Sequence, residues 1–124
     1  MYPLVLSSFF FQIPAYYAYR HGFYVYAASS FITSVLSINY WRRPTLSWRR
    51  TLDIVWARSA GTFFFIDGMR HTSVLTSVSV LLFMLGFYYL SVTYPHHPQW
   101  YLYHMTFHGI AALSQCAVTY SIIN

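Results

Sequence analysis

The sequence predicts an all-α protein, a polytopic bundle of about five transmembrane helices, and three observations support this. Hydrophobic residues make up 57% of the chain and charged residues only 7%, whereas a water-soluble domain carries about a quarter charged residues. Low charge accompanies disorder only when hydrophobicity is also low, and here it is high. The apolar residues also fall into long runs between short polar breaks. Residues 1–124 are therefore expected to form a single transmembrane domain.

Five apolar runs predict the spans. They are Tyr2–Tyr19, Gly22–Trp41, Thr51–Ile66, Thr72–Val92 and Gln99–Ile123. Crossing the hydrocarbon core takes roughly 20 apolar residues, and only the third run is short for this. Its ends would need snorkelling side chains or shielding by neighbouring helices. Pro14 should kink the first span. A membrane barrel is excluded because it needs at least about eight alternating strands.

The polar breaks predict which ends of the spans share a side. With five spans, the N-terminus, the Arg42–Arg50 loop and the His96-His97 loop lie together, opposite Arg20 and Arg70. Positively charged loops stay inside, which places the N-terminus on the cytosolic or matrix-equivalent side. An organelle inner membrane or a viral membrane would fit this orientation. Four side chains of the loop are expected to contact anionic headgroups or an acidic partner: Arg42, Arg43, Arg49 and Arg50.

Composition excludes several classes of function. The formal charge of +5 is too small and too scattered for a nucleic-acid partner. Only two acidic residues are present, which rules out ordinary two-carboxylate catalysis. The single cysteine, Cys116, cannot form an internal disulfide, so the redox compartment is undetermined.

His104 and His108 are the first candidate site. Four residues apart on the fifth span, their rings project from one helix face and could share a metal ion. His97 joins the same line if the helix begins early. Alternatively, both rings pack in the aromatic interior, hydrogen-bonded to serine, threonine or tyrosine. Two histidines alone do not make a metal site, so their spacing favours the packing interpretation.

Asp53 and Arg58 are charged residues within the third span. A carboxylate at membrane depth is costly and is by default a functional hypothesis. The structural alternative is that Asp53 pairs with Arg49 or Arg50, one turn earlier. Arg58 lies about 140° around the helix from Asp53. It is therefore expected to reach another helix, a lipid headgroup or another subunit.

Two pairs of small residues are spaced for close helix packing. Ser30 and Ser34 lie four apart on the second span, and Ala57 and Gly61 lie four apart on the third. Small residues at this spacing let helices approach closely in lipid. We expect packing contacts at both pairs.

Segments 34–40, 52–54 and 104–108 (SVLSINY, LDI and HMTFH) resemble motifs of the superfamily of alkaline ceramidases, progestin/adiponectin receptors and hemolysin-III-like proteins. In that superfamily a serine and a histidine end one span, an aspartate opens the next, and an HxxxH motif closes the bundle around a catalytic zinc. The resemblance implies a zinc held by His104 and His108, with Asp53 beside it. The chain departs from the family by having five predicted spans instead of seven. It also has Asn39-Tyr40 where a histidine ligand belongs, and His97 or His21 would lie outside that span. These departures imply that the metal and the hydrolysis have been lost.

Two functions are therefore expected. The first is a non-catalytic accessory subunit of a larger membrane-embedded assembly, such as an organellar respiratory complex or a virion inner membrane, with lipids and other subunits as partners and no cofactor. The second is a zinc-dependent membrane lipid hydrolase, or its inactive relic. The balance favours a protein that is not an enzyme.

Overall fold

All regular structure in the described residues is helical. The computed structural model describes residues 2–43, 47–93 and 100–123. They form α1 (Tyr2–Ser8), the 3-10 helix η1 (Phe9–Phe11), α2 (Gln12–Arg20), α3 (Tyr24–Trp41), α4 (Trp48–His71), α5 (Val74–Thr93) and α6 (Trp100–Ile123). Because α1, η1 and α2 follow one another without a break, the chain builds five helical rods. The all-α prediction is confirmed.

The first rod departs from α-helical geometry just before its proline. Residues Phe9–Phe11 take the 3-10 form, and Pro14 lies buried in α2 three residues after that turn ends. A proline ring clashes with the carbonyl four residues earlier and offers no N–H to it. For Pro14 that carbonyl belongs to Phe10, inside the 3-10 turn. The proline explains the position of the 3-10 turn, whereas the kink expected at Pro14 stays a prediction.

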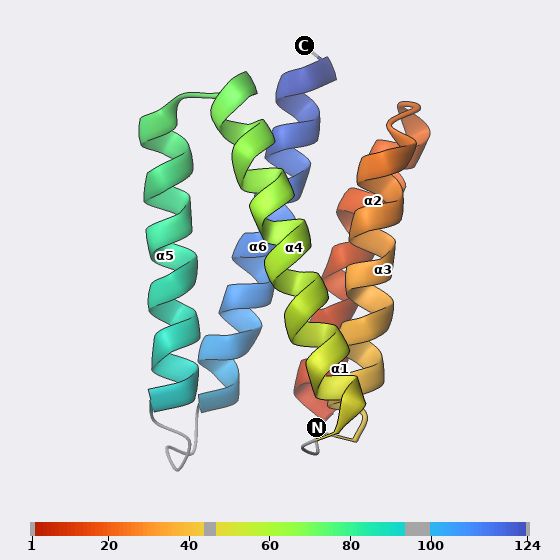
Figure 1. Ribbon diagram of the computed structural model, residues 1–124, viewed down its shortest axis with the longest axis vertical. Coiled ribbons are helices and arrows are strands. Elements are labelled where there is room, and N and C mark those ends of the chain that lie inside the picture. The colour runs from red at the N-terminus through yellow and green to blue at the C-terminus, as the bar shows by residue number, and fades with distance from the viewer. Residues whose placement is uncertain (1, 44–46, 94–99, 124) are drawn as a thin grey trace.

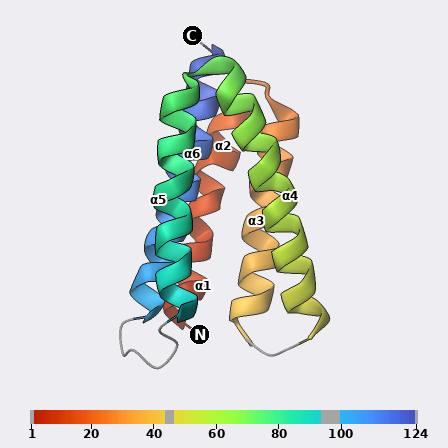
Figure 2. The same ribbon diagram turned by 60° about the vertical axis from the view of Figure 1, so that its left-hand side comes forward.

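The rods run up and down the bundle. One end of the bundle carries the N-terminus, the end of α3, the start of α4, the end of α5 and the start of α6. The C-terminus lies at the other end (Figure 1). Turned by 60°, the bundle shows α5 and α6 on one side and α3 and α4 on the other (Figure 2). Helix α6 packs against α1, α2, α4 and α5 and is the central helix, whereas α5 packs against α4 and α6 within the described residues.

Helix α4 is longer than the sequence predicts. The expected span, Thr51–Ile66, is extended to Trp48–His71. Arg49 and Arg50 therefore lie in its first turn, and Arg70 in its last, instead of in loops. The prediction was wrong because polar side chains mark the water-facing ends of a helix as readily as a loop. A cation in the last turn also stabilises a helix through its dipole. The rest of the predicted loop, residues 44–46, and His96 and His97 lie outside the described residues.

One described helix is long and apolar enough to cross a membrane. Its span, Val74–Val92 in α5, has a mean hydropathy of 1.8, and 6% of it is buried inside the protein. The core helix of a soluble protein would be mostly buried, so the exposure of α5 does not fit that description. In the other long helices, serine, histidine and arginine lower the mean hydropathy.

The interior is unusually polar and the exterior unusually apolar. The apolar core divides into two small clusters, one around Ala18, Phe64 and Val118 and one around Phe11 and Ala111. Between and beside these clusters lie buried polar side chains: Ser7, Ser8, Ser30, Thr33, Ser34, Ser37, Ser91, His104, His108, Gln115 and Thr119. Large apolar side chains are meanwhile exposed on every rod.

The two small-residue pairs have different surroundings. Ser30 and Ser34 are fully buried on α3, as close packing requires. Ala57 and Gly61 are exposed on α4, and a Cβ atom added to Gly61 would meet nothing within 4 Å. Packing is therefore confirmed for the first pair. It is wrong for the second pair as a contact within the described chain.

Candidate functional site: a buried serine–histidine cluster

The candidate site begins on the buried face of α6. His104 and His108 are both buried, at 9% and 4% exposure, and both point into the bundle as their spacing predicts. The same face continues through Ala111, Ala112, Gln115, Val118 and Thr119. Polar and small residues thus form a stripe along the central helix, and serines from three other rods meet it.

His108 is hydrogen-bonded to the first rod. Its Nδ1 atom lies 2.8 Å from the Ser7 hydroxyl oxygen, and that hydroxyl donates to the Leu4 carbonyl at 3.1 Å. A hydroxyl has one proton to donate. When that proton goes to Leu4, the Nδ1 atom of His108 is the donor to Ser7. This arrangement corresponds to the Nδ1–H tautomer of His108.

His104 is bound in the same way by α5. Its Nδ1 atom lies 3.2 Å from the Ser91 hydroxyl oxygen, which donates to the Tyr88 carbonyl at 2.6 Å. The same arrangement corresponds to the Nδ1–H tautomer of His104. The two histidines thus join α6 to two other rods. Each serine hydroxyl also donates a hydrogen bond to a carbonyl of its own helix.

Aromatic rings surround the histidine pair. The two imidazoles meet edge to face with their centroids 4.7 Å apart. Trp41 lies edge-on to His104 at 5.0 Å, and Phe11 lies edge-on to His108 at 5.5 Å. Edge-to-face contacts of this kind stabilise aromatic packing. The structure therefore places the histidines in an aromatic, hydrogen-bonded interior, as the packing interpretation predicts.

Serines extend the polar cluster to α3. The Ser8 and Ser37 hydroxyl oxygens lie 2.6 Å apart, and Ser34 donates to the Ser8 carbonyl at 2.9 Å. Ser8 also donates to the Leu4 carbonyl at 2.7 Å. Toward the C-terminus of α6, Ser30 donates to the Gln115 side-chain oxygen at 2.7 Å. We call this set of hydrogen-bonded residues the serine–histidine cluster: Ser7, Ser8, Ser30, Ser34, Ser37, Ser91, His104, His108 and Gln115.

Four members of the cluster were not predicted from the sequence: Ser7, Ser8, Ser91 and Gln115. One signal was available for Gln115, because it lies seven residues after His108 and so shares its helix face. Ser7 and Ser8 are adjacent polar residues in a mostly apolar run, which marks them as unusual but does not identify their partners. For Ser91 the sequence offers no comparable signal.

In the described residues, neither Asn39 nor Asp53 joins the two histidines as the superfamily pattern implies. The Asn39 side-chain oxygen accepts two hydrogen bonds from the Arg42 guanidinium, at 3.1 and 2.9 Å. Asp53 is half-buried on α4. Arg49, one turn earlier, donates to the Arg43 carbonyl at 3.4 Å. The pairing of Asp53 with Arg49 or Arg50 stays a prediction.

No three metal-ligating side chains come together in the part of the chain that the structure describes. His104 and His108 are adjacent, but Asp53 does not join them as a third member. His97, the other residue considered for this line, lies outside the described residues. Both Nδ1 atoms are occupied by serines, so any metal would have to meet the two Nε2 atoms.

The remaining charged candidates lie at the surface. Arg42, Arg43 and Arg50 are exposed at the end of the bundle that carries the N-terminus, and Arg49 is half-buried there. Arg58 is exposed on the outer face of α4. The expected grouping of four arginines at one end of the bundle is present, although two of them belong to a helix.

Comparison of the chain with protein-family models, with curated proteins and with solved structures finds no match.

Proposed function

We propose that this chain is a multi-pass membrane protein that acts as a non-catalytic subunit of a larger membrane-embedded assembly. The observation that carries the proposal is the inverted distribution of polarity. Serine, threonine, histidine and glutamine side chains are buried in the bundle beside its two small apolar clusters, while phenylalanine, leucine, valine and tyrosine cover its outside. Soluble monomers rarely expose large contiguous apolar patches. In lipid, by contrast, an apolar surface is the required one.

The exposed face of α5 supports the membrane setting. Leu75 is 78% exposed, and Leu82 and Phe83 are exposed by about two thirds. Exposing this apolar face to water would cost a free energy of roughly 25 cal/mol for each Å². Lipid or another apolar helix removes that cost. The backbone groups of α5 are satisfied within the helix, as lipid demands.

Arg58 supports an assembly instead of an isolated bundle. It lies ten residues into α4, about 15 Å from the start of a helix about 36 Å long. In a spanning helix that is close to the middle of the bilayer, and the side chain faces outward. A guanidinium facing lipid at that depth costs about 3 kcal/mol or more. A polar or acidic group from another subunit would remove this cost.

The basic end of the bundle gives the proposed orientation. Arg42, Arg43, Arg49 and Arg50 would face anionic headgroups or an acidic partner on the cytosolic or matrix-equivalent side. Guanidinium groups form bidentate contacts with phosphate or carboxylate. An organelle inner membrane and a viral membrane both meet this description.

The second candidate is a zinc-dependent membrane lipid hydrolase or its relic, and one observation favours it. In the Nδ1–H tautomer each histidine keeps its Nε2 lone pair, and metal-ligating histidines commonly donate their other nitrogen to a protein oxygen. Under this candidate, His104 and His108 would hold the metal and Asp53 would orient a water molecule. The candidate ranks second because Asn39, at the place of the missing ligand, is engaged by Arg42.

Two measurements test the proposed function. Membranes from expressing cells are washed with alkaline carbonate, and the chain is expected to stay in the pellet. It is then extracted in mild detergent and sized on a native gel, where a particle larger than the single chain in its micelle is expected. Release by carbonate would contradict the membrane proposal. Retention with only the single chain on the gel would contradict the assembly.

A further inference from the structure

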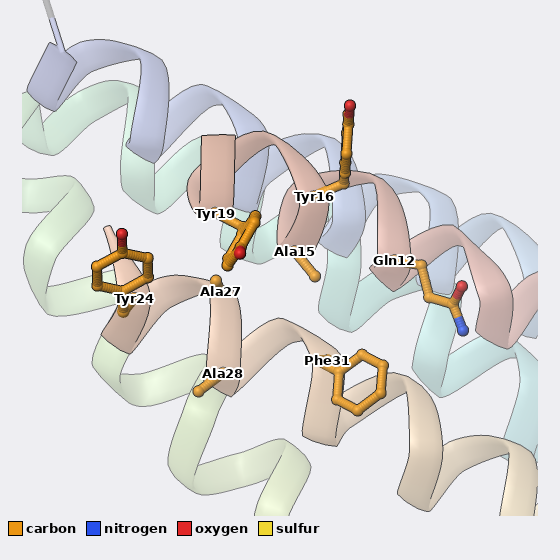
Figure 3. Close-up of a pocket in the computed structure, with 8 residues that line it drawn as sticks. All are labelled: Gln12, Ala15, Tyr16, Tyr19, Tyr24, Ala27, Ala28 and Phe31. Carbon is orange, nitrogen blue, oxygen red and sulfur yellow. The ribbon is translucent and has the colours of Figure 1, made fainter. Parts of the chain in front are cut away.

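A groove between α2 and α3 opens on the outer face of the bundle and encloses about 460 Å³. Three alanines, Ala15, Ala27 and Ala28, line it with small side chains and leave the space between the helices unfilled. Tyr19 and Tyr24 stand at one end, and Gln12 and Phe31 lie toward the other (Figure 3). The groove is therefore mostly apolar. Two tyrosines stand at one end, and an amide and a phenylalanine lie toward the other.

The aromatic end lies beside an exposed arginine. The rings of Tyr19 and Tyr24 are 5.8 Å apart, and Arg20 is the last residue of α2. Its Nη1 atom donates to the Tyr16 hydroxyl at 3.1 Å, and its guanidinium carbon lies 5.9 Å from the Tyr16 ring centroid. Tyr16 itself lines the groove. Arg20 is therefore held against Tyr16, which points away from α3 (Figure 3), so its guanidinium lies beside the groove and does not itself line it.

Arg20 keeps most of its binding capacity for a ligand. A guanidinium has five N–H donors, and the structure shows one of its nitrogens bound to Tyr16. Its planar fork matches the oxygens of a phosphate. Arg20 also lies at the end of the bundle where α2 turns into α3 (Figure 1). In a membrane-spanning bundle that end meets the headgroups.

We propose that this groove binds an anionic phospholipid, with one acyl chain between α2 and α3 and the phosphate on Arg20. The proposal rests on the proposed membrane setting of the chain. The volume lies within the range of about 300–1,000 Å³ that is usual for small-ligand sites. A transmembrane helix, about 10–12 Å across with its side chains, is too wide for it. From Arg20 to Gln12 the groove follows the chain for about 12 Å along α2, so the upper part of one acyl chain fills it.

Photolabelling tests the site. The full chain is reconstituted in phosphatidylcholine vesicles with a trace of diazirine-bearing phosphatidylglycerol, and the labelled peptides are mapped by mass spectrometry. Label is expected on peptides that cover residues 12–31. The phosphatidylcholine analogue should label them about fivefold less, because one basic group near the surface is worth about that factor for an anionic lipid.

Two variants and two controls assign the label to the groove. Arg20→Gln should lower phosphatidylglycerol labelling about fivefold, and Ala28→Phe should lower it by filling the groove. Both positions are exposed, so the fold is expected to survive. Arg70→Gln, at the same end, and Ala57→Phe, on the outer face of α4, should label like the unmodified chain.

The lipid site and the membrane setting are contradicted by different results. Equal labelling by the two lipids, or labelling unchanged in Arg20→Gln and Ala28→Phe, contradicts the site alone if the chain resists alkaline carbonate. A chain that carbonate releases from the vesicles contradicts the membrane setting, and the lipid site falls with it.

Discussion

The Nδ1 atom of His108 lies 2.8 Å from the hydroxyl oxygen of Ser7, although 101 residues separate them in the chain. This bond joins the first rod to the last and lies among serine contacts to α3 and α5. In a bundle whose surface is apolar, such buried bonds select one packing of the rods from many. Lipid gives helix association no hydrophobic driving force, so packing and interhelical hydrogen bonds carry it.

Ser7→Ala should therefore destabilise the bundle by roughly 0.5–2 kcal/mol, because it leaves the Nδ1–H group of His108 without its acceptor. Reversible unfolding in a titration with SDS measures the change. Ser79→Ala is the matched control, since Ser79 is exposed and its hydroxyl donates to the Leu75 carbonyl of its own helix. Equal losses in the two variants would show that the Ser7–His108 bond contributes nothing specific.

A double-mutant cycle should show that Ser7 and His108 act as a pair. The combined Ser7→Ala and His108→Phe variant is expected to lose less stability than the sum of the single losses, by about 0.5 kcal/mol or more. The coupling of Ser7→Ala with Gln115→Leu provides the comparison, because Gln115 bonds to Ser30 and not to Ser7. Additive losses for Ser7 and His108 would refute the coupling.

Much of the fold follows from the sequence, and the reason is the length of the apolar runs between the breaks. The fifth apolar run, Gln99–Ile123, corresponds to α6, Trp100–Ile123, within the described residues. The third was placed too short, since Arg49 and Arg70 lie within helical turns. A charged residue indicates a position in contact with water or headgroups. Such a position can lie at a helix end as well as in a loop.

The site was predictable only in part. The spacing of His104 and His108 gives their shared face, because helix geometry is local. The pairing of His108 with Ser7 depends on which rods are neighbours and on their axial offset, and neither is encoded in a local pattern. A contact of Arg49 shows the same limit. Sequence separation indicates that Arg49 could meet Asp53, but not that it donates to the Arg43 carbonyl.

The topology can be tested with single cysteines in a Cys116→Ser background. Cysteines at positions 45 and 97, which lie outside the described residues, are expected on the same side of the membrane. A cysteine at Ser73, in the turn between α4 and α5, should be on the opposite side. Accessibility to a membrane-impermeant maleimide in sealed vesicles makes the measurement. Labelling of positions 45 and 97 from opposite sides would refute the five-span arrangement.

Neutralising the four basic residues at one end should loosen the orientation of the bundle. The variant combines Arg42→Gln, Arg43→Gln, Arg49→Gln and Arg50→Gln. It removes about 1 kcal/mol of headgroup attraction for each residue, so a mixed orientation and weaker assembly are expected in the maleimide assay and on native gels. The double variant Arg20→Gln/Arg70→Gln, at the other end, controls for loss of charge as such. Unchanged orientation together with unchanged assembly would count against the proposed role of these arginines.

The purified chain is expected to carry no stoichiometric zinc and to show no hydrolase activity. His104 and His108 supply two ligands, whereas a catalytic zinc site uses three protein ligands and a water molecule. Asn39, at the position of the third, is hydrogen-bonded to Arg42. Elemental analysis makes the measurement. About one zinc per chain, lost in His104→Ala or His108→Ala, would place the hydrolase first.

Arg58→Leu should weaken the assembly while leaving the chain itself folded. Its side chain is exposed on α4, so its removal is expected to open no cavity in the bundle. In lipid the substitution even relieves the cost of an outward-facing charge. A partner subunit that pairs with the guanidinium would lose that contact. The native gel should then show a smaller particle, with SDS unfolding equal to or better than that of the unmodified chain.

Arg58→Lys tests whether a partner recognises the positive charge at this position or the planar guanidinium group. A lysine keeps the positive charge but not the planar fork of the guanidinium, so the larger particle should persist, with weaker association on dilution. Ala57→Phe, one residue away on the exposed surface, tests whether a partner approaches α4 closely, and it should also reduce the particle. An unchanged particle in both Arg58→Leu and Ala57→Phe would show that α4 faces lipid, and the partner contact would then have to lie on another rod.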